Sequence, residues 1–291
     1  MSAPTETDTG LLAARLAAAV RARRPLRAIG TASAVAARVA VETGFDALWV
    51  SGLEVSTSLG LPDENVLGPR DLADTVLALT RTATLPVIVD VDNAGGTPAT
   101  ARRFAGDLSR AGASALCLED SAYPKVNSFA LHRVQALAPV ETMSEQLAAM
   151  REAAGSQVAL IARTEALICG ASVSEAVERA AAYAAAGADA VLIHSKDRSG
   201  AQALATAAAW TEAVPLVTVP TAFAHLAPDE LGEAGFALAI YANQLSRAAL
   251  AAMRQAASSF QATGSFTADG TVLSDVADLL KIADPAARAC L

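Results

Sequence analysis

Acidic and basic side chains follow a series of short apolar runs, and their types suit the binding of a small anion. Asp90 and Asp92 follow one run, Glu119 follows another, and Arg163 and Glu165 follow a third. Carboxylates are the ligands that Mg²⁺ accepts in proteins, together with water and substrate oxygens. An arginine can bind a carboxylate or phosphoryl group through two hydrogen bonds. We therefore predict a site for Mg²⁺ and a small anionic substrate.

Three further features add to this site. His194 follows another apolar run, and it could bind a substrate oxygen or move a proton. The long segment 120–139 has weak periodicity, and we expect it to form a lid that carries Lys125 and Asn127 over the substrate. Asp63 could be a nucleophile or a base, but its sequence surroundings alone favour a turn.

The apolar runs have a repeated form that indicates how the polar residues are positioned. In four segments a helical pattern stops at a glycine and a continuous apolar run follows, at 43–50, 111–118, 186–193 and 234–240. Four more apolar runs of strand length alternate with them, at 26–29, 85–89, 158–162 and 215–219. Uninterrupted apolar runs are typical of strands that are buried on both faces, as in parallel sheets.

Together the two sets predict eight strands with helices between them. The expected helices are 34–42, 71–82, 99–110, 144–153, 174–185, 201–210, 228–233 and 244–262. Eight repeated βα units predict an α/β fold that closes as a (β/α)8 TIM barrel. A doubly wound open sheet is the alternative, but no Gly-x-Gly-x-x-Gly motif follows the first strand. In a barrel, the polar residues would share the rim where active sites of this fold lie.

Length and composition limit the other possibilities. We expect a disordered lead at 1–10 and a single barrel domain at 11–291, which includes a C-terminal helical extension at 243–291. A net charge of −8 without a basic face argues against a nucleic-acid partner. Apolar runs are too short for a membrane span, and the N-terminus lacks a signal pattern, so we expect a cytoplasmic protein.

Several blocks of residues together resemble the phosphoenolpyruvate mutase / isocitrate lyase superfamily, and most closely its phosphoenolpyruvate mutases. The blocks are Trp49-Val50-Ser51-Gly52-Leu53-Glu54, Leu61-Pro62-Asp63, Asp90-Val91-Asp92, Cys117-Leu118-Glu119-Asp120, Pro124-Lys125-Val126-Asn127-Ser128, Ile161-Ala162-Arg163-Thr164-Glu165 and Ile193-His194-Ser195-Lys196. The resemblance implies an Mg²⁺-dependent barrel that interconverts phosphoenolpyruvate and phosphonopyruvate in phosphonate biosynthesis. It also implies a homotetramer or dimer with exchanged C-terminal helices.

The resemblance assigns roles to individual residues. It implies that Asp90, Asp92 and Glu119 form the metal group. The substrate contacts that it implies are Trp49, Ser51, Gly52, Leu53, Asn127, Ser128, Arg163, Glu165 and His194. The catalytic residues that it implies are Asp63, Lys125, Asn127, Arg163 and His194, with Asp63 beside the migrating phosphoryl group.

The relatives differ at positions that keep alternatives open. Lyases carry a Lys-x-Cys-Gly-His motif in the lid and hydrolases tend to have Thr in place of Asn127, so both comparisons favour a mutase. The chain departs from the mutase pattern at Asn93-Ala94-Gly95-Gly96, at Ser121 and at Thr31-Ala32-Ser33. The alternatives are a phosphonopyruvate hydrolase, a C–C lyase that acts on a related 2-oxo acid or phosphonate, and a degenerate barrel that only binds a metabolite.

Overall fold

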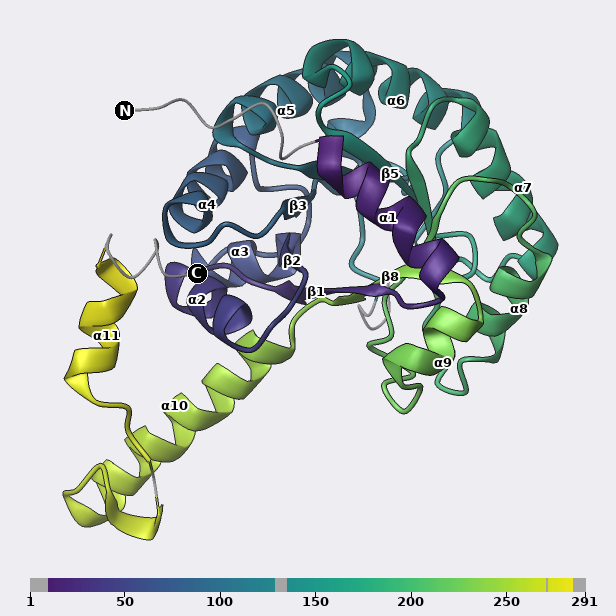
Figure 1. The fold of residues 1–291 in the computed structure, drawn as a ribbon. Coiled ribbons are helices and arrows are strands. Elements are labelled where there is room, and N and C mark those ends of the chain that lie inside the picture. Colours follow the sequence, from purple (N-terminus) through teal and green to yellow (C-terminus); the bar gives the residue numbers. More distant parts are fainter. Residues whose placement is uncertain (1–9, 129–134, 271, 285–291) are drawn as a thin grey trace.

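Eight parallel strands close into a barrel in the computed structural model, which describes residues 10–128, 135–270 and 272–284 (Figure 1). Each strand pairs with the next one along the chain, and β8 pairs with β1. The strands are β1 Leu26–Gly30, β2 Ala47–Val50, β3 Val87–Asp90, β4 Ala115–Glu119, β5 Ala159–Thr164, β6 Ala190–Ile193, β7 Leu216–Thr218 and β8 Phe236–Tyr241. The predicted (β/α)8 barrel is therefore confirmed.

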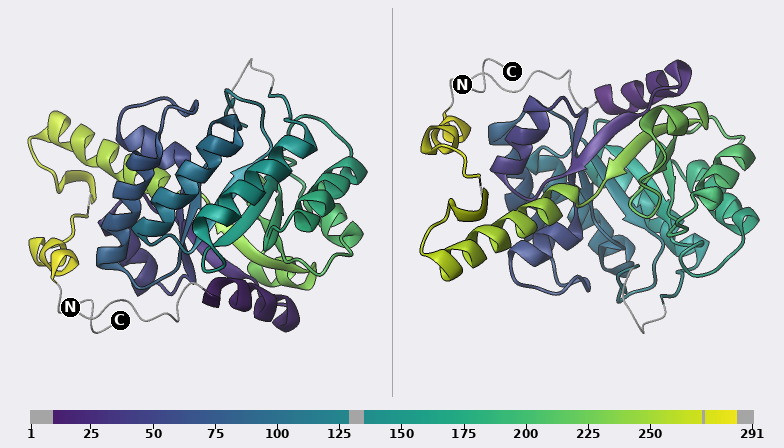
Figure 2. Two further views of the ribbon diagram at one scale, coloured as in Figure 1. Left: turned by 90° about the horizontal axis from the view of Figure 1, so that it is seen from above. Right: turned by 90° about the horizontal axis from the view of Figure 1, so that it is seen from below.

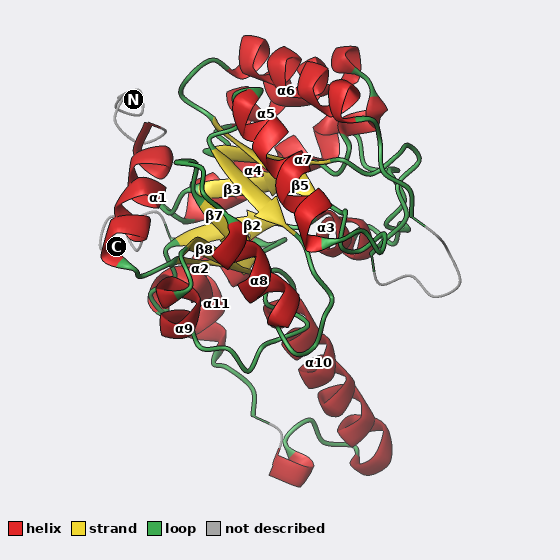
Figure 3. Cartoon of the chain, turned by 90° about the vertical axis from the view of Figure 1, so that its right-hand side faces the viewer, coloured by secondary structure: helices red, strands yellow, loops and turns green. Residues whose placement is uncertain are grey.

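Helices surround the strands at the positions that the sequence predicted, within a few residues (Figure 3). They are α2 Ala34–Glu42, α4 Pro69–Thr82, α5 Pro98–Ala111, α6 Val140–Ala154, α7 Val173–Ala185, α8 Ala201–Ala209 and α9 Pro228–Glu233. Helix α5 shows why the boundaries could be predicted. The Thr97 hydroxyl accepts a hydrogen bond from the amide of Thr100, and Gly112 ends the helix at a φ of 97°, a conformation that glycine adopts without a Cβ penalty.

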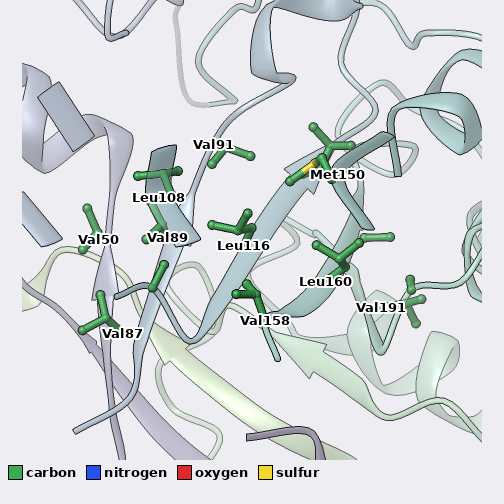
Figure 4. Packing of buried hydrophobic residues seen from close by; sticks show 14 of the residues in the cluster. Val50, Val87, Val89, Val91, Leu108, Leu116, Met150, Val158, Leu160 and Val191 are labelled. Atoms are coloured by element: carbon green, nitrogen blue, oxygen red, sulfur yellow. The ribbon is translucent and has the colours of Figure 1, made fainter. Parts of the chain in front are cut away.

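Strand residues alternate between the barrel interior and the helical layer. Val89 and Leu116, which are neighbours in the sheet, pack outward against the helices (Figure 4). Ile88 and Cys117 belong to the separate cluster that fills the interior. A slip of one residue would exchange the two faces, so burial fixes the strand register. The register in turn fixes which side chains end each strand at the rim.

Two helices of the structure are not among those that the sequence predicted. Helix α1, Gly10–Ala22, lies across one end of the barrel, where Leu12 and Leu16 are fully buried with the interior cluster (Figure 1). Gly10 was placed in the disordered lead, and this is wrong because the residue begins α1. Helix α3, Gly52–Ser58, begins directly after Ser51 at the end of β2, where no helix was expected. Residues 1–9 of the lead, 129–134 of the lid and 285–291 of the extension lie outside the described residues.

The C-terminal extension leaves the barrel as an arm. Helix α10, Gln244–Thr263, points away from the strands, whereas α11, Val276–Ala283, lies back beside the barrel and contacts α2 (Figure 2). At the end of α10, the rings of Phe260 and Phe266 stack with centroids 4.5 Å apart. None of the helices in the described part of the chain has the length and apolar character needed to cross a membrane.

Candidate active site

A pocket lies at the carboxyl ends of the strands, on the rim where the sequence predicted a site. Its lining is Trp49, Ser51, Leu53, Asp63, Asp90, Glu119, Lys125, Val126, Asn127, Ser128, Arg163, His194, Val219, Thr221, Ala242 and Asn243. The structure thus brings nearly all predicted site residues to one place. The other three, Gly52, Asp92 and Glu165, do not line the pocket but contact residues that do.

The turn after β2 offers backbone amides to the pocket. Ser51 is the N-cap of α3, so the first amides of this helix lack acceptors within the helix. Such amides favour a negatively charged group. A Cβ on Gly52 would lie 3.2 Å from Asp92 Oδ1, so a larger residue here would press on that carboxylate. Trp49 is buried below this turn, and its Nε1 finds no hydrogen-bond partner among the described residues.

Arg163 and His194 form the cationic side of the pocket, and Glu165 holds both. Arg163 Nε donates to Glu165 Oε1 at 2.5 Å, and His194 Nδ1 lies 2.8 Å from the same oxygen. Burial alone would raise the pKa of Glu165, but the neighbouring Arg163 and His194 hold it well below the usual range. The fully buried side chain of Glu165 orients the two residues that face the pocket, and its contact with substrate stays a prediction.

Asp90 and Glu119 end neighbouring strands and face the guanidinium of Arg163. Arg163 Nη1 lies 3.6 Å from Asp90 Oδ2, and Nε lies 3.4 Å from Glu119 Oε2. Asp92, two residues beyond the strand, instead pairs with Lys125 Nζ. Burial raises the pKa of Asp92 to about 6 and that of Glu119 to about 8, although Lys125 and Arg163 respectively oppose the shift. The neighbouring cations therefore compensate only in part for the burial of these two carboxylates.

The chemistry of this donor set fits Mg²⁺. Within residues 10–128, 135–270 and 272–284, no three Asp, Glu, His or Cys side chains converge as a ready-made metal cage. Mg²⁺ does not need one, because it is usually held by one or two carboxylates, with water and substrate oxygens in its other positions. A divalent cation would also lower the cost of the buried carboxylates Asp92 and Glu119. The residues predicted to bind metal are thus suitable ligands.

The described part of the predicted lid segment places three polar side chains over the pocket. Lys125 Nζ lies 3.0 Å from Asp63 Oδ1, and Asn127 Nδ2 donates to Asp63 Oδ2 at 2.5 Å. The Ser128 hydroxyl donates to Glu165 at 2.6 Å. Burial lowers the pKa of Lys125, but four surrounding carboxylates reverse the effect and keep its ammonium charged. Asp63 is therefore a member of the site and not merely a turn residue. Movement of the lid stays a prediction.

The sequence also placed polar residues at the rim after the seventh and eighth apolar runs, but it assigned them no role in the site. Thr221 and Asn243 line the pocket there, beside Val219 and Ala242. Thr221 Oγ1 and Asn243 Oδ1 are buried and have no hydrogen-bond partner in the described structure. The signal in the sequence was weak, because Thr221 and Asn243 are each only a polar residue that follows an apolar run. Both atoms are placed to contact a ligand.

Known proteins match nearly the whole chain. The family profile described as phosphoenolpyruvate phosphomutase matches residues 16–261. The phosphoenolpyruvate phosphomutase of Streptomyces hygroscopicus is 40% identical over 228 residues, which are 78% of this chain and 72% of that protein. The phosphonopyruvate hydrolase of Variovorax sp. (strain Pal2) is 36% identical over 242 residues, 82% of this chain and 83% of that one. The 2-methylisocitrate lyase of Bacillus subtilis (strain 168) is 31% identical over 246 residues, 82% of this chain and 78% of that protein.

Solved structures give the same result. The phosphoenolpyruvate phosphomutase of Streptomyces platensis subsp. rosaceus superposes with a TM-score of 0.88 at 35% identity, over 93% of this chain and 94% of that one. A phosphonopyruvate hydrolase in complex with oxalate and Mg²⁺ superposes with a TM-score of 0.84 at 32% identity, with the same coverage. A mutase, a hydrolase and a lyase are thus all similar to this chain.

Proposed function

The chain belongs to the phosphoenolpyruvate phosphomutase family, a family of enzymes, and we propose that it interconverts phosphonopyruvate and phosphoenolpyruvate with Mg²⁺ as its cofactor. In one direction the P–C bond of phosphonopyruvate breaks and leaves its electron pair on the pyruvate enolate. The enolate oxygen then bonds to the phosphorus and gives phosphoenolpyruvate. Neither water nor a second substrate is consumed, so the site must hold the phosphoryl group and exclude water.

The observation that carries this proposal is the position of Asp63. Its carboxylate is held from the lid side by Lys125 Nζ at 3.0 Å and by Asn127 Nδ2 at 2.5 Å, and it lines the pocket. A phosphoryl group in transfer carries charge on its oxygens and is stabilised by fixed cations and donors. Lys125 and Asn127 supply such donors, and the lid segment that carries them would shield the group from water.

The remaining residues divide into those that bind the anion and those that hold the metal. Arg163 and His194, held by Glu165, would bind the anionic groups of the substrate, and the amides after Ser51 would receive its oxygens. Asp90, Asp92 and Glu119 would hold Mg²⁺. When bound, Mg²⁺ supplies charge that stabilises the enolate and orients the 2-oxo acid.

The reaction can be tested by ³¹P NMR with phosphonopyruvate and the purified protein. We expect the phosphonate signal to be replaced by a phosphate-ester signal, with no reaction when EDTA removes Mg²⁺. Free phosphate with equimolar pyruvate would instead identify a hydrolase. If phosphonopyruvate stays unchanged although calorimetry shows that it binds in the presence of Mg²⁺, the mutase proposal is wrong.

A hydrolase or a C–C lyase is the second candidate, because relatives with these names match the chain over similar lengths. In a hydrolase, the oxygen of water attacks the phosphorus in place of the enolate oxygen, so the two reactions differ only in which oxygen reaches the phosphoryl group. A lyase would consume a 2-oxo acid precursor without any phosphorus chemistry. A barrel that only binds a metabolite would bind oxalate equally well with and without Mg²⁺.

We also propose that the arm packs on a second copy of this chain. Helix α10 leaves the barrel and buries only Ser259, while Met253 on its surface is 62% exposed. Leu280 on α11 is 69% exposed. Exposed apolar groups of this size on neighbouring helices mark an interaction surface. A dimer or tetramer with exchanged arms would cover them.

A further inference from the structure

A network of neutral side chains lies behind the charged residues of the site. Asn93 follows Asp92, Ser121 lies two residues after Glu119, and Asn65 lies two residues after Asp63. Three rim loops that each carry a site carboxylate thus also carry a neutral polar residue. Asn93 and Ser121 are almost completely buried, so their hydrogen bonds form away from bulk water.

The hydrogen bonds of this network connect the three loops. Ser121 Oγ donates to Glu119 Oε1 at 2.6 Å, and Asn93 Nδ2 donates to the backbone oxygen of Ser121 at 3.2 Å and to its hydroxyl at 3.4 Å. Asn65 Nδ2 donates to Asn93 Oδ1 at 3.0 Å, and Asn65 Oδ1 accepts from the backbone amide of Lys125 at 2.5 Å. One end of the network therefore holds a predicted metal ligand, and the other holds the backbone of the catalytic lysine.

The backbone around Asn93 shows that this position needs such support. Asp92 has a φ of 50° and Ala94 a φ of 48°, a region that residues with a side chain enter only at a cost. Asn93 lies between them. Its Oδ1 also accepts from the amide of Gly95 at 3.2 Å, and its backbone oxygen accepts from Gln146 Nε2 at 2.8 Å. These contacts hold the loop in the conformation that turns Asp92 toward Lys125.

We propose that Asn65, Asn93 and Ser121 are positioning residues that fix Glu119 for the metal and tie the lysine loop to the metal loop. Ser121 engages only Oε1 of Glu119, while Oε2 faces Arg163, so the carboxylate keeps one orientation. Because all three residues are uncharged, they orient the carboxylate without replacing the cation that it attracts. Hydrogen bonds of this kind to a metal ligand typically change metal affinity by about 10–100-fold. The inference rests on the proposed function, since it assumes that Glu119 binds the metal.

The test is the affinity of the full-length protein for Mn²⁺, measured by electron paramagnetic resonance without substrate. We expect Ser121→Ala to weaken Mn²⁺ binding by about tenfold or more and Ser121→Thr, which keeps the hydroxyl, to restore most of the affinity. Ser114→Ala is the matched control, because Ser114 is also buried and hydrogen-bonded, to the amide of Val87, but lies at the other end of the strands. It should bind Mn²⁺ like the unmodified protein.

Combining two substitutions shows whether these residues act as one hydrogen-bond network or independently of one another. In the Asn93→Ala background, Ser121→Ala should cause a much smaller loss of Mn²⁺ affinity than in the unmodified protein, because the hydroxyl is no longer oriented. Asn93→Ala should also speed hydrogen exchange at the amide of Lys125. Three results would each overturn the inference and leave the proposed function standing. They are an unchanged Mn²⁺ affinity in Ser121→Ala, an equal loss of Mn²⁺ affinity in Ser114→Ala, and losses from Asn93→Ala and Ser121→Ala that simply add in the double variant. An unmodified protein that does not bind Mn²⁺ either without or with phosphonopyruvate would overturn both proposals, whereas free phosphate as the NMR product would overturn the mutase proposal alone.

Discussion

Replacement of Glu54 by Gln should stabilise the protein, and increasingly so as the pH rises. Glu54 lies on α3 immediately after the amides of the pocket, and its side chain is almost completely buried. The Ser246 hydroxyl on α10 donates to Oε1, while Oε2 has no hydrogen-bond partner within the described residues. Burial raises the pKa of Glu54 from 4.5 to about 7, although the bonds from Ser246 oppose this.

The sign and size of the effect follow from the two pKa values. Because the pKa is higher in the folded state, the unfolded chain releases this proton first, and stability is lost as the pH rises from about 4.5 through about 7. The loss amounts to about 1 kcal/mol at pH 5 and about 3 kcal/mol at pH 8. Glutamine is never charged and can still accept the bond from Ser246, so Glu54→Gln avoids this loss. The other buried carboxylates are the same in both proteins and cancel in the difference.

The measurement is thermal unfolding of both proteins between pH 5 and pH 8, at equal protein concentration and in EDTA. A gain of about 3 kcal/mol corresponds to an increase in Tm of about 5 °C at pH 8 for a chain of this size, against about 2 °C at pH 5. Glu145→Gln, on the exposed surface of α6, is the matched control and should leave Tm unchanged at every pH. A difference that stays constant between pH 5 and pH 8 would refute the reasoning.

Two further predictions concern catalysis and assembly. Asp63→Asn should lower kcat by about a thousandfold or more, while the Mn²⁺ affinity stays within about threefold of the original value. The reason is that Asp63 is held by Lys125 and Asn127 and not by the metal group. Turnover near the original rate would remove Asp63 from the mechanism. Met253→Glu on the exposed face of α10 should convert the proposed oligomer to a smaller species in light scattering. Leu204→Glu on α8, which also replaces an exposed apolar residue, should not. An unchanged mass in Met253→Glu would show that the arm does not form the interface.

The barrel could be predicted because its signals are local and repeated. Each strand is a continuous apolar run and each of four helices stops at a glycine, so eight units could be counted without knowledge of any contact. Asp90, Glu119 and Arg163 were placed at the rim for the same reason, since all three lie at or near the ends of strands. The strand register that burial imposes then determined their position.

Helix α3 and the neutral network could not be predicted, because their stability comes from contacts between distant parts of the chain. Residues 52–58 contain Gly, Ser and Thr, which are weak helix formers, and the helix is held by burial of Val55 and by the bond from Ser246 to Glu54. Asn93 and Ser121 are 28 residues apart. Nothing in the sequence near either residue indicates that the other is its partner.

Residues at the strand ends and residues held by contacts between distant parts of the chain differ in what they contribute to the reaction. Relatives named as a mutase, a hydrolase and a lyase match the same chain, so we expect residues fixed by the strands, such as Asp90 and Arg163, to belong to a framework that can serve all three reactions. What selects among the reactions must then lie in segments that the strands do not fix. In this chain those segments carry Asp63 and Asn127, which are hydrogen-bonded to each other at the pocket. Under the proposed function, we expect these two residues to decide whether the enolate oxygen or a water molecule reaches the phosphoryl group.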